Sequence, residues 1–157
     1  MTDAIRHPTV RQATSQSEIA TCLAIREAVF TFEQGVPPEL ELDAFDAVST
    51  HYLAFVDGTA QGTGRVRMVD GMAKVQRVAV LAPARGTGLG AALMARIVAD
   101  LCDRGEARAV TLGSQESAVG FYERLGFRRH GERFMDAGIP HFEMRLALDR
   151  VRATQDA

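Results

Sequence analysis

Features that this chain of 157 residues lacks narrow its class before any motif is considered. No apolar run approaches the ~18 residues of a membrane span, and the first residues lack the apolar stretch of a secretory signal. The formal net charge of −2 gives no reason to expect DNA or another polyanion as a partner. The two cysteines, Cys22 and Cys102, lie in helical patterns without metal-ligand spacing. We therefore expect a cytoplasmic protein with two reduced, buried thiols and no metal site.

The composition that is present is typical of a globular domain. Hydrophobic residues make up 46% of the chain and charged residues 24%. The length is sufficient for one domain with its own core. We expect a single domain over residues 1–157, with a polar tail from about residue 148.

The pattern of apolar residues and turn signals predicts an α/β fold. Strands are expected at 10–13 and 51–56, and a further strand follows the turn at 57–58 and reaches 69. Four more strands are expected at 72–80, 109–112, 127–134 and 141–146. Asp57-Gly58 and Asp70-Gly71 indicate hairpin turns. A first helix of about four turns is expected from a capping box at Ser15 and Glu18, with Gly35 and the pair Pro37-Pro38 stopping it. Two further helices are expected from a glycine-rich turn to Gly105 and from an N-cap at Ser117 to Gly126. With a loop or short helix at 36–50, this order predicts a mixed sheet of six to seven strands and helices on both faces.

The glycine-rich turn Arg85-Gly86-Thr87-Gly88-Leu89-Gly90 stands between an expected strand and an expected helix. Glycines allow consecutive backbone N–H groups to converge on one phosphate group. The helix that follows adds its unpaired first-turn donors and the positive end of its dipole. The sequence therefore predicts a phosphate-bearing ligand here.

Three kinds of phosphate site compete for this turn. A nucleotide P-loop needs a lysine after the glycines, and none follows them. A dinucleotide fingerprint fits Gly86, Gly88 and Ala91, but it belongs in the first β-α-β unit of a fold, whereas antiparallel hairpins precede this turn. Its acidic residue should end the next strand, whereas Asp103 and Glu106 precede that strand. The diphosphate of coenzyme A is the third candidate.

Two blocks of the sequence resemble the GNAT superfamily of N-acetyltransferases. The run from Val78 to Gly90 resembles motif A, and the run from Ser117 to Phe127 resembles motif B with its Phe-Tyr-x-x-x-Gly-Phe signature. The stretch from Glu33-Gln34-Gly35-Val36-Pro37 to His51, and the run Gly138-Ile139-Pro140-His141, are similar to the ElaA-like branch. The resemblance covers residues 10–146 and implies the GNAT, or acyl-CoA N-acyltransferase, fold.

The resemblance also implies acetyl-CoA as the co-substrate. In that fold the fourth and fifth strands splay apart, the pantetheine arm bonds the backbone of Val78 and Val80, and the glycine turn holds the diphosphate. The coenzyme-binding residues carried over are Val78, Ala79, Val80, Arg85, Gly86, Thr87, Gly88, Leu89, Gly90, Ala91, Phe121 and Tyr122. Tyr122 is expected to act as general acid for the departing thiolate, and its other interpretation is a core tyrosine with a solvated hydroxyl.

The general base is left open by the sequence. Many members of the superfamily carry a glutamate where this chain has Gln76, which cannot take up a proton at neutral pH. Glu33, His51 and His141 are the candidates for base or substrate ligand. Each also has a structural interpretation, as an ion-pair partner, a strand residue or a hairpin hydrogen-bond donor.

The acidic stretch from Glu33 to Asp46 suggests a cationic acceptor, although long solvated loops are often acidic as well. Arg26 interrupts an apolar stripe, so we expect it to pair with an acid. Arg65, Arg67 and Arg77, on strands, are expected to be charge partners or surface residues.

The function we expect is direct acetyl transfer from acetyl-CoA to a primary amine of a small molecule or peptide. A direct mechanism is favoured because neither cysteine has a neighbouring base in sequence. The first rival is a non-catalytic acyl-CoA-binding sensor, which Gln76 keeps open. The second is an acyltransferase with another donor, because the N-terminal half is distantly similar to acyl-homoserine-lactone synthases. A homodimer is expected from family habit alone.

Overall fold

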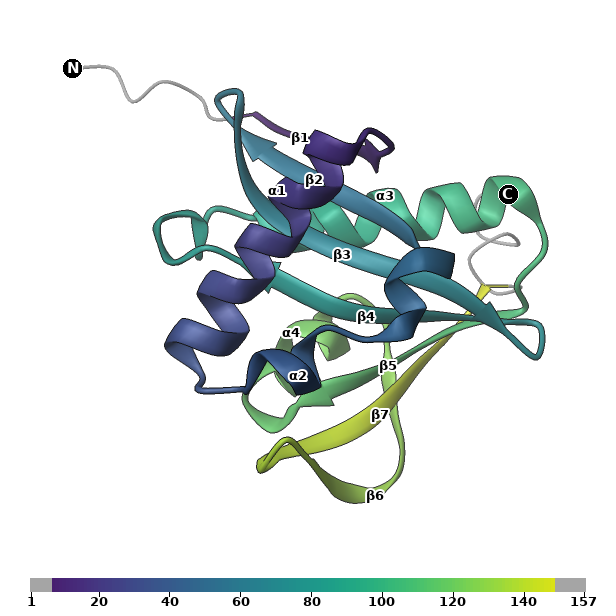
Figure 1. The fold of residues 1–157 in the computed structure, drawn as a ribbon. Helices are drawn as coiled ribbons and strands as arrows, with labels where there is room; N and C mark the ends of the chain where they lie inside the picture. The colour runs from purple at the N-terminus through teal and green to yellow at the C-terminus, as the bar shows by residue number, and fades with distance from the viewer. Residues whose placement is uncertain (1–6, 149–157) are drawn as a thin grey trace. The chain divides into compact units, whose positions relative to one another are not determined.

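The seven strands form one mixed sheet in the order β1-β2-β3-β4-β5-β7-β6 (Figure 1). The structure, a computed structural model, describes residues 7–148. The strands are β1 (Pro8–Ala13), β2 (Thr50–Val56), β3 (Thr59–Val69), β4 (Met72–Val80), β5 (Ala109–Gln115), β6 (Arg128–Asp136) and β7 (Ile139–Ala147). The α-helices are α1 (Gln16–Arg26), α2 (Pro38–Glu41), α3 (Leu89–Arg104) and α4 (Val119–Arg124). A π-helix, η1 (Glu27–Glu33), follows α1 directly. The short 3-10 helices are η2 (Ala44–Val48), η3 (Ala82–Ala84) and η4 (Glu116–Ala118).

The strand pairings explain why the sheet is mixed. β1 runs antiparallel to β2, β5 antiparallel to β7, and β6 antiparallel to β7. β4 runs parallel to β5, with Met72–Val75 opposite Ala109–Leu112. A parallel pair needs a crossover connection, which α3 supplies. The predicted mixed α/β sheet of six to seven strands is confirmed, with seven.

Two compact units divide the chain. Unit 1 comprises the residues up to Arg65 together with Arg77–Ile97, and unit 2 comprises Val66–Gln76 together with the residues from Val98 onward. The polar tail expected from about residue 148 lies, after Leu148, outside the described residues. No helix within residues 7–148 is long and apolar enough to cross a bilayer.

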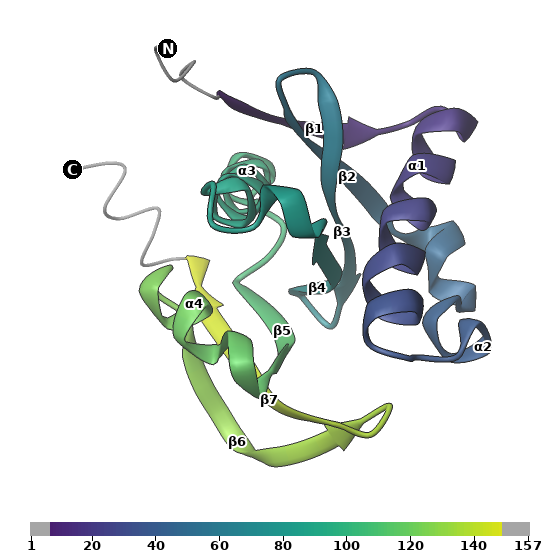
Figure 2. The ribbon, with the colours of Figure 1, turned by 90° about the vertical axis from the view of Figure 1, so that its left-hand side faces the viewer.

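Unit 1 is built around strands with a helix on each face. Figure 2 shows α1 on one side of β2 and β3 and the first half of α3 on the other. On the α1 side, side chains from β1, α1, β2 and β4 form a buried cluster that includes Ala13, Cys22, Ile25, Leu53 and Ala79. On the α3 side, the glycines of β3 provide room: a Cβ on Gly62 would lie 3.4 Å from Leu89 Cδ2, and one on Gly64 would lie 3.6 Å from Leu93 Cδ2. The start of α3 is therefore packed closely against β3.

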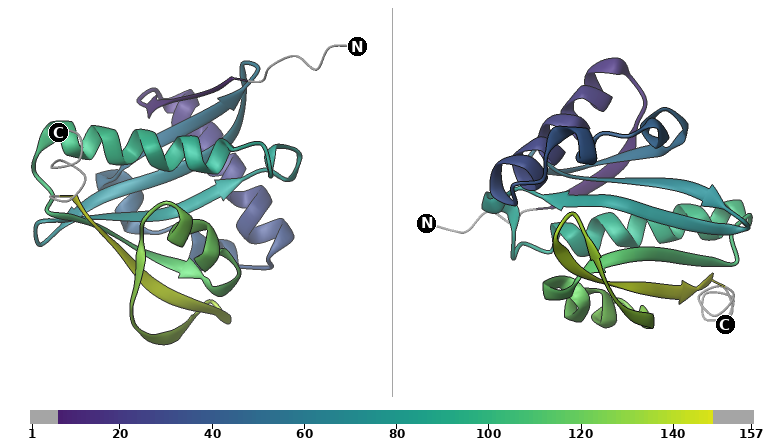
Figure 3. Two further views of the ribbon diagram at one scale, coloured as in Figure 1. Left: turned by 180° about the vertical axis from the view of Figure 1, so that it is seen from behind. Right: turned by 60° about the horizontal axis from the view of Figure 1, so that its bottom comes forward.

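Unit 2 contains β5, β7 and β6 in succession, with α4 against them (Figure 3). Its core includes Leu112 of β5, Met144 of β7, Phe127 and the α4 residues Val119 and Tyr122, all buried. Every residue of the outer strand β6 is exposed.

The local predictions are confirmed in most places. Ser15 and Glu18 form the capping box of α1, and β4 has the predicted bounds. The helical stretch that starts with α1 continues through η1 to Glu33 and ends just before Gly35, where the sequence predicts its stop. The N-cap predicted at Ser117 is wrong, because residues 116–118 form the 3-10 turn η4 and α4 is capped by Ala118 without a side-chain hydrogen bond.

Candidate functional site

The glycine turn lies in unit 1 between η3 and α3. Gly86 has φ +78 and Gly88 has φ +86, in the region that residues with a Cβ rarely adopt. A Cβ built on either glycine would meet nothing within 4 Å. The two glycines are therefore required by backbone conformation, and the main chain around them faces open space.

The first amides of α3 point into this turn without intrahelical acceptors. The Ala92 N–H is the first to donate back along the helix, to the Gly88 carbonyl oxygen at 3.0 Å. The N–H groups of Leu89, Gly90 and Ala91 precede it, so no carbonyl of the helix can accept from them. Together with the dipole of a 16-residue helix, they make this end suited to an anion.

Side chains hold the turn in place. Thr87 Oγ1 donates to the Ala84 carbonyl oxygen at 2.5 Å, and Arg85 Nε donates to the Val80 carbonyl oxygen at 3.0 Å. Arg85 Nη2 also pairs with Glu33 Oε1 at 2.9 Å, at the end of η1. Glu33 is thus engaged with a predicted coenzyme-binding residue.

β4 carries an unusual residue directly before Val78. Arg77 has φ +56, a left-handed conformation for a residue with a Cβ inside a strand. The following residues, Val78, Ala79 and Val80, belong to unit 1 and alternate between half-buried and buried. Sequence reasoning missed this feature, and no residue type near Arg77 signals it.

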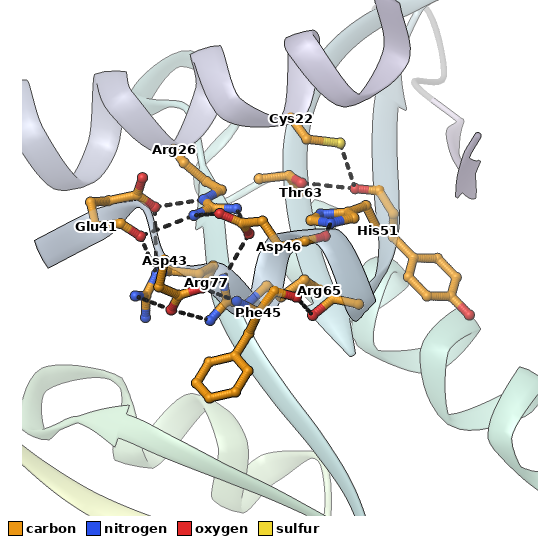
Figure 4. A network of polar contacts seen from close by, with 12 residues as sticks. Cys22, Arg26, Glu41, Asp43, Phe45, Asp46, His51, Thr63, Arg65 and Arg77 are labelled. Carbon is orange, nitrogen blue, oxygen red and sulfur yellow. Dashed lines mark hydrogen bonds and ion pairs between the residues drawn. The ribbon is translucent and has the colours of Figure 1, made fainter. Parts of the chain in front are cut away.

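A cluster of three arginines and three carboxylates lies beside β4 in unit 1 (Figure 4). This arginine–carboxylate cluster consists of Arg26 on α1, Arg65 on β3, Arg77 on β4, and Glu41, Asp43 and Asp46 from α2 and the turn around η2.

Arg26 and Arg65 are the buried centres of this cluster, each with a side chain 1% exposed. Arg26 Nε donates to Glu41 Oε1 at 2.5 Å and its Nη1 donates to Asp46 Oδ1 at 2.6 Å. Arg65 Nη1 donates to both Asp43 and Asp46 at 2.7 Å, and its Nη2 donates to the second oxygen of Asp43. The expected pairing of Arg26 with an acid is confirmed, and Arg65 is a charge partner as predicted.

Two carboxylates of the cluster have lowered pKa values. Burial by itself would raise the pKa of Asp46, but hydrogen bonds from Arg26 and Arg65 outweigh it and lower that pKa to about 2. The pKa of Asp43 is lowered as well, chiefly by its hydrogen bond from Arg65. These carboxylates neutralise arginines of the same chain, so the acidic stretch gives less support to a cationic acceptor than its sequence suggests.

His51 on β2 is 4% exposed and belongs to unit 1. Its Nε2 lies 2.8 Å from the Asp46 carbonyl oxygen and must donate to it, since a carbonyl oxygen only accepts. This contact assigns the proton of a neutral ring to Nε2. The Nδ1 atom is buried without a hydrogen-bond partner. The ring therefore supports the segment around η2 and presents no exposed nitrogen to a substrate.

Tyr122 and Phe121 lie on α4 in unit 2. Tyr122 is 7% exposed and contacts Phe121 and Phe127 edge to face, with ring centroids 5.0 Å and 5.7 Å away. Burial raises the pKa of its hydroxyl to about 12. The phenol consequently stays protonated over the physiological pH range and is able to act as a hydrogen-bond donor.

His141 lies near the start of β7 in unit 2, where it pairs with Gln115 of β5. Its Nδ1 lies 2.7 Å from the Ile139 carbonyl oxygen and must donate to it, which leaves the lone pair on Nε2. The ring stacks on Phe134, with centroids 5.6 Å apart. Of the two predicted histidines, His141 has the ring nitrogen better suited to accept a proton.

The candidate residues fall into two sets. Unit 1 brings together the glycine turn, its Arg85–Glu33 pair, residues Val78–Val80 and His51. Unit 2 brings together Phe121, Tyr122 and His141. Among residues 7–148, no three His, Cys, Asp or Glu side chains are grouped so as to hold a metal ion.

Comparisons with known proteins identify the family and the fold. The family described as the acetyltransferase (GNAT) domain matches residues 12–148. The uncharacterized N-acetyltransferase YjcF of Bacillus subtilis is 37% identical over 133 residues, which are 84% of this chain and 94% of the relative. A solved acyl-CoA N-acyltransferase of Pseudomonas aeruginosa is 30% identical with a TM-score of 0.79, over 90% of this chain and 99% of that one. Escherichia coli ElaA is 25% identical with a TM-score of 0.77, over 89% and 98%. The resemblance stated from the two sequence blocks is thus confirmed.

Proposed function

The chain belongs to the GNAT acetyltransferase family, and from this premise we propose that it transfers the acetyl group of acetyl-CoA directly to a primary amine, with Tyr122 as the hydrogen-bond donor to the departing thiolate. The observation that carries the proposal is the turn at the head of α3. Its two left-handed glycines and the first-turn amides of a long helix, which have no acceptor within the helix, are suited to a diphosphate.

The main chain of Val78–Val80 supports the binding of the thioester arm. In acetyl transfer, negative charge develops on the thioester oxygen, and a backbone N–H held in a strand is a preorganised donor for it. Because this contact uses main-chain atoms, it constrains the path of β4 and leaves the side chains of Val78 and Val80 to packing. Arg85 adds a positive charge beside the turn, held by Glu33 and the Val80 carbonyl.

Tyr122 supplies a donor for the departing sulfur. The new C–N bond forms as the C–S bond breaks, so the sulfur acquires negative charge that a donor stabilises. With a pKa of about 12, against ~8.5 for an ordinary thiol, a complete proton transfer from Tyr122 would be uphill. The favoured role of Tyr122 is therefore a hydrogen bond to the developing thiolate, with solvent completing protonation.

We assign the role of general base to His141. The attacking amine must be neutral and must lose a proton as the C–N bond forms. Nδ1 of His141 is committed to the Ile139 carbonyl, so Nε2 carries the lone pair that accepts this proton. Arg85 engages Glu33 through Oε1, and the second nitrogen of His51 is buried, so we favour His141 over both.

A thiol-release assay tests the proposed function. Acetyl-CoA is incubated with a panel of amines that includes small alkylamines, polyamines, amino-acid amides and peptides with free N-termini. Turnover with at least one amine, abolished or strongly reduced in His141→Gln, is the expected outcome. Binding of acetyl-CoA without turnover on any amine would favour the non-catalytic sensor, and turnover only with acyl carrier protein would favour another donor.

A further inference from the structure

Arg77 has a left-handed backbone and a side chain bound to the segment that ends α2, and both features affect the path of β4. Its backbone is left-handed, with φ +56, in the middle of β4. Residues with a Cβ avoid this conformation unless surrounding contacts impose it. The next residues are Val78, Ala79 and Val80, so the turn of the main chain at Arg77 sets the direction in which their N–H and C=O groups point.

The side chain of Arg77 is bound to the end of α2 through several polar contacts. Its Nε donates to the Glu41 carbonyl oxygen at 3.0 Å, and its Nη2 donates to the Leu40 carbonyl oxygen at 3.3 Å. Nη2 also contacts Asp43 Oδ2 at 3.2 Å. Nε also lies 3.5 Å from Glu41 Oε1 in an ion pair. Two of the three hydrogen-bond acceptors are main-chain atoms, so the guanidinium recognises the position of α2 itself.

The end of α2 is in turn fixed by the other two arginines of the cluster. Arg26 bonds both the side chain and the carbonyl oxygen of Glu41, the latter at 3.0 Å. Arg65 grips both carboxylate oxygens of Asp43 at 2.7 Å. Both arginines are fully buried, so the end of α2 is held by rigid groups, and α2 provides a fixed anchor for Arg77.

We propose that Arg77 is a positioning residue for acyl-CoA: its guanidinium, anchored on the end of α2 by the arginine–carboxylate cluster, holds its own backbone left-handed and so directs the main chain of Val78–Val80 toward the thioester arm. The inference rests on the proposed function. It assigns to the acidic stretch a part in coenzyme binding, in place of the attraction of a cationic acceptor.

A matched pair of substitutions tests the inference. Arg77→Ala and Arg77→Gly remove the same side-chain contacts, but only glycine adopts φ +56 without a steric penalty. Acetyl-CoA affinity is measured by titration calorimetry, together with KM and kcat on the best amine. We expect about a tenfold loss of acetyl-CoA affinity in Arg77→Ala and recovery to within about threefold of the unsubstituted protein in Arg77→Gly, with kcat changed less than KM. Arg11→Ala, which removes an exposed arginine of β1 paired with Glu18, serves as the control and should leave the affinity unchanged.

Each result decides between the inference and its alternatives. Equal affinities in the unsubstituted protein and Arg77→Ala, or a glycine variant no better than the alanine variant, would overturn the inference while leaving the proposed function intact. If the unsubstituted protein does not bind acetyl-CoA, the proposed function itself fails. If Arg77→Ala does not fold, Asp43→Asn replaces it, because it withdraws one carboxylate from Arg77 and from the Arg65 contact that anchors the segment, while Asp46 stays on Arg65. That variant should bind acetyl-CoA about two- to threefold more weakly, and an unchanged affinity would refute the anchoring.

Discussion

Replacing Asp46 by asparagine should destabilise the protein through the arginine–carboxylate cluster. Asp46 accepts hydrogen bonds from Arg26 at 2.6 Å and from Arg65 at 2.7 Å, and its side chain is 20% exposed. The substitution keeps the size of the side chain and removes its charge. Two guanidinium groups that are each 1% exposed would then share one fewer counter-charge.

The size of the expected loss in unfolding free energy follows from the lowered pKa of Asp46. Its fall from 3.8 to about 2 corresponds, at ~1.36 kcal/mol per pKa unit, to about 2 kcal/mol in favour of the folded state. Screening at a partly exposed site reduces this value, while leaving buried arginines undercompensated adds to it. We expect a loss of about 2–4 kcal/mol at neutral pH, which for a chain of this length lowers Tm by roughly 5–15 °C.

The pH dependence of the unfolding free energy tests independently whether the charge of Asp46 causes the loss of stability. Because the pKa of Asp46 is lower in the folded state, its contribution is fully present above 3.8 and is lost as the pH falls toward about 2. Urea unfolding of both proteins between pH 7 and pH 3 should show the difference in unfolding free energy narrowing to about half by pH 3.

The control is Glu39→Gln, which removes a charge from the exposed face of α2 in the same segment. Its effect should be within about 0.5 kcal/mol. A variant Asp46→Asn as stable as the control, or a stability difference that stays constant down to pH 3, would refute the reasoning.

Three other substitutions are expected to have measurable effects on activity, acetyl-CoA binding or stability. Tyr122→Phe should lower kcat about 10- to 100-fold with little change in acetyl-CoA affinity, measured by thiol release and calorimetry, and equal kcat would remove Tyr122 from the mechanism. Gly88→Ala should cost about 1–2 kcal/mol of stability and weaken acetyl-CoA binding, because alanine is strained at φ +86, and unchanged Tm and affinity would contradict that account of the turn. Ser15→Ala should cost about 1 kcal/mol in thermal unfolding by removing the side chain that accepts from the Glu18 N–H, with no effect on kcat, and an altered kcat would show that α1 influences the site.

Local sequence signals were sufficient where the structure is determined locally. β4 has the predicted bounds because the Asp70-Gly71 turn starts it and the η3 turn around Pro83 ends it. The N-cap prediction at Ser117 was wrong because Ser117 lies inside the 3-10 turn η4, which moves the N-cap of α4 one residue later, to Ala118. The helical stretch that starts at Gln16 ends at Glu33 because Gly35, with φ +73, stops it as the residue type predicts.

The site was predictable only in part, because some of its features depend on residues that are distant in sequence. Glycines report their conformation through their residue type, so the turn at Gly86 and Gly88 was visible in the sequence. Arg77 was not, since its left-handed backbone depends on contacts with Glu41 and Asp43, more than 30 residues earlier in the chain. The acidic stretch suggested attraction of a substrate because the sequence does not show that Arg65 lies against it.

Calorimetric titration with a pair of ligands tests the central claim most directly. In the proposed site, the backbone amides at the start of α3 bind the diphosphate of the coenzyme. Acetyl-CoA should therefore bind with a single-site isotherm, at least tenfold more tightly than acetyl-pantetheine, which lacks the diphosphate and the nucleotide. Absence of any heat with acetyl-CoA, or equal affinity for the two ligands, would contradict the account.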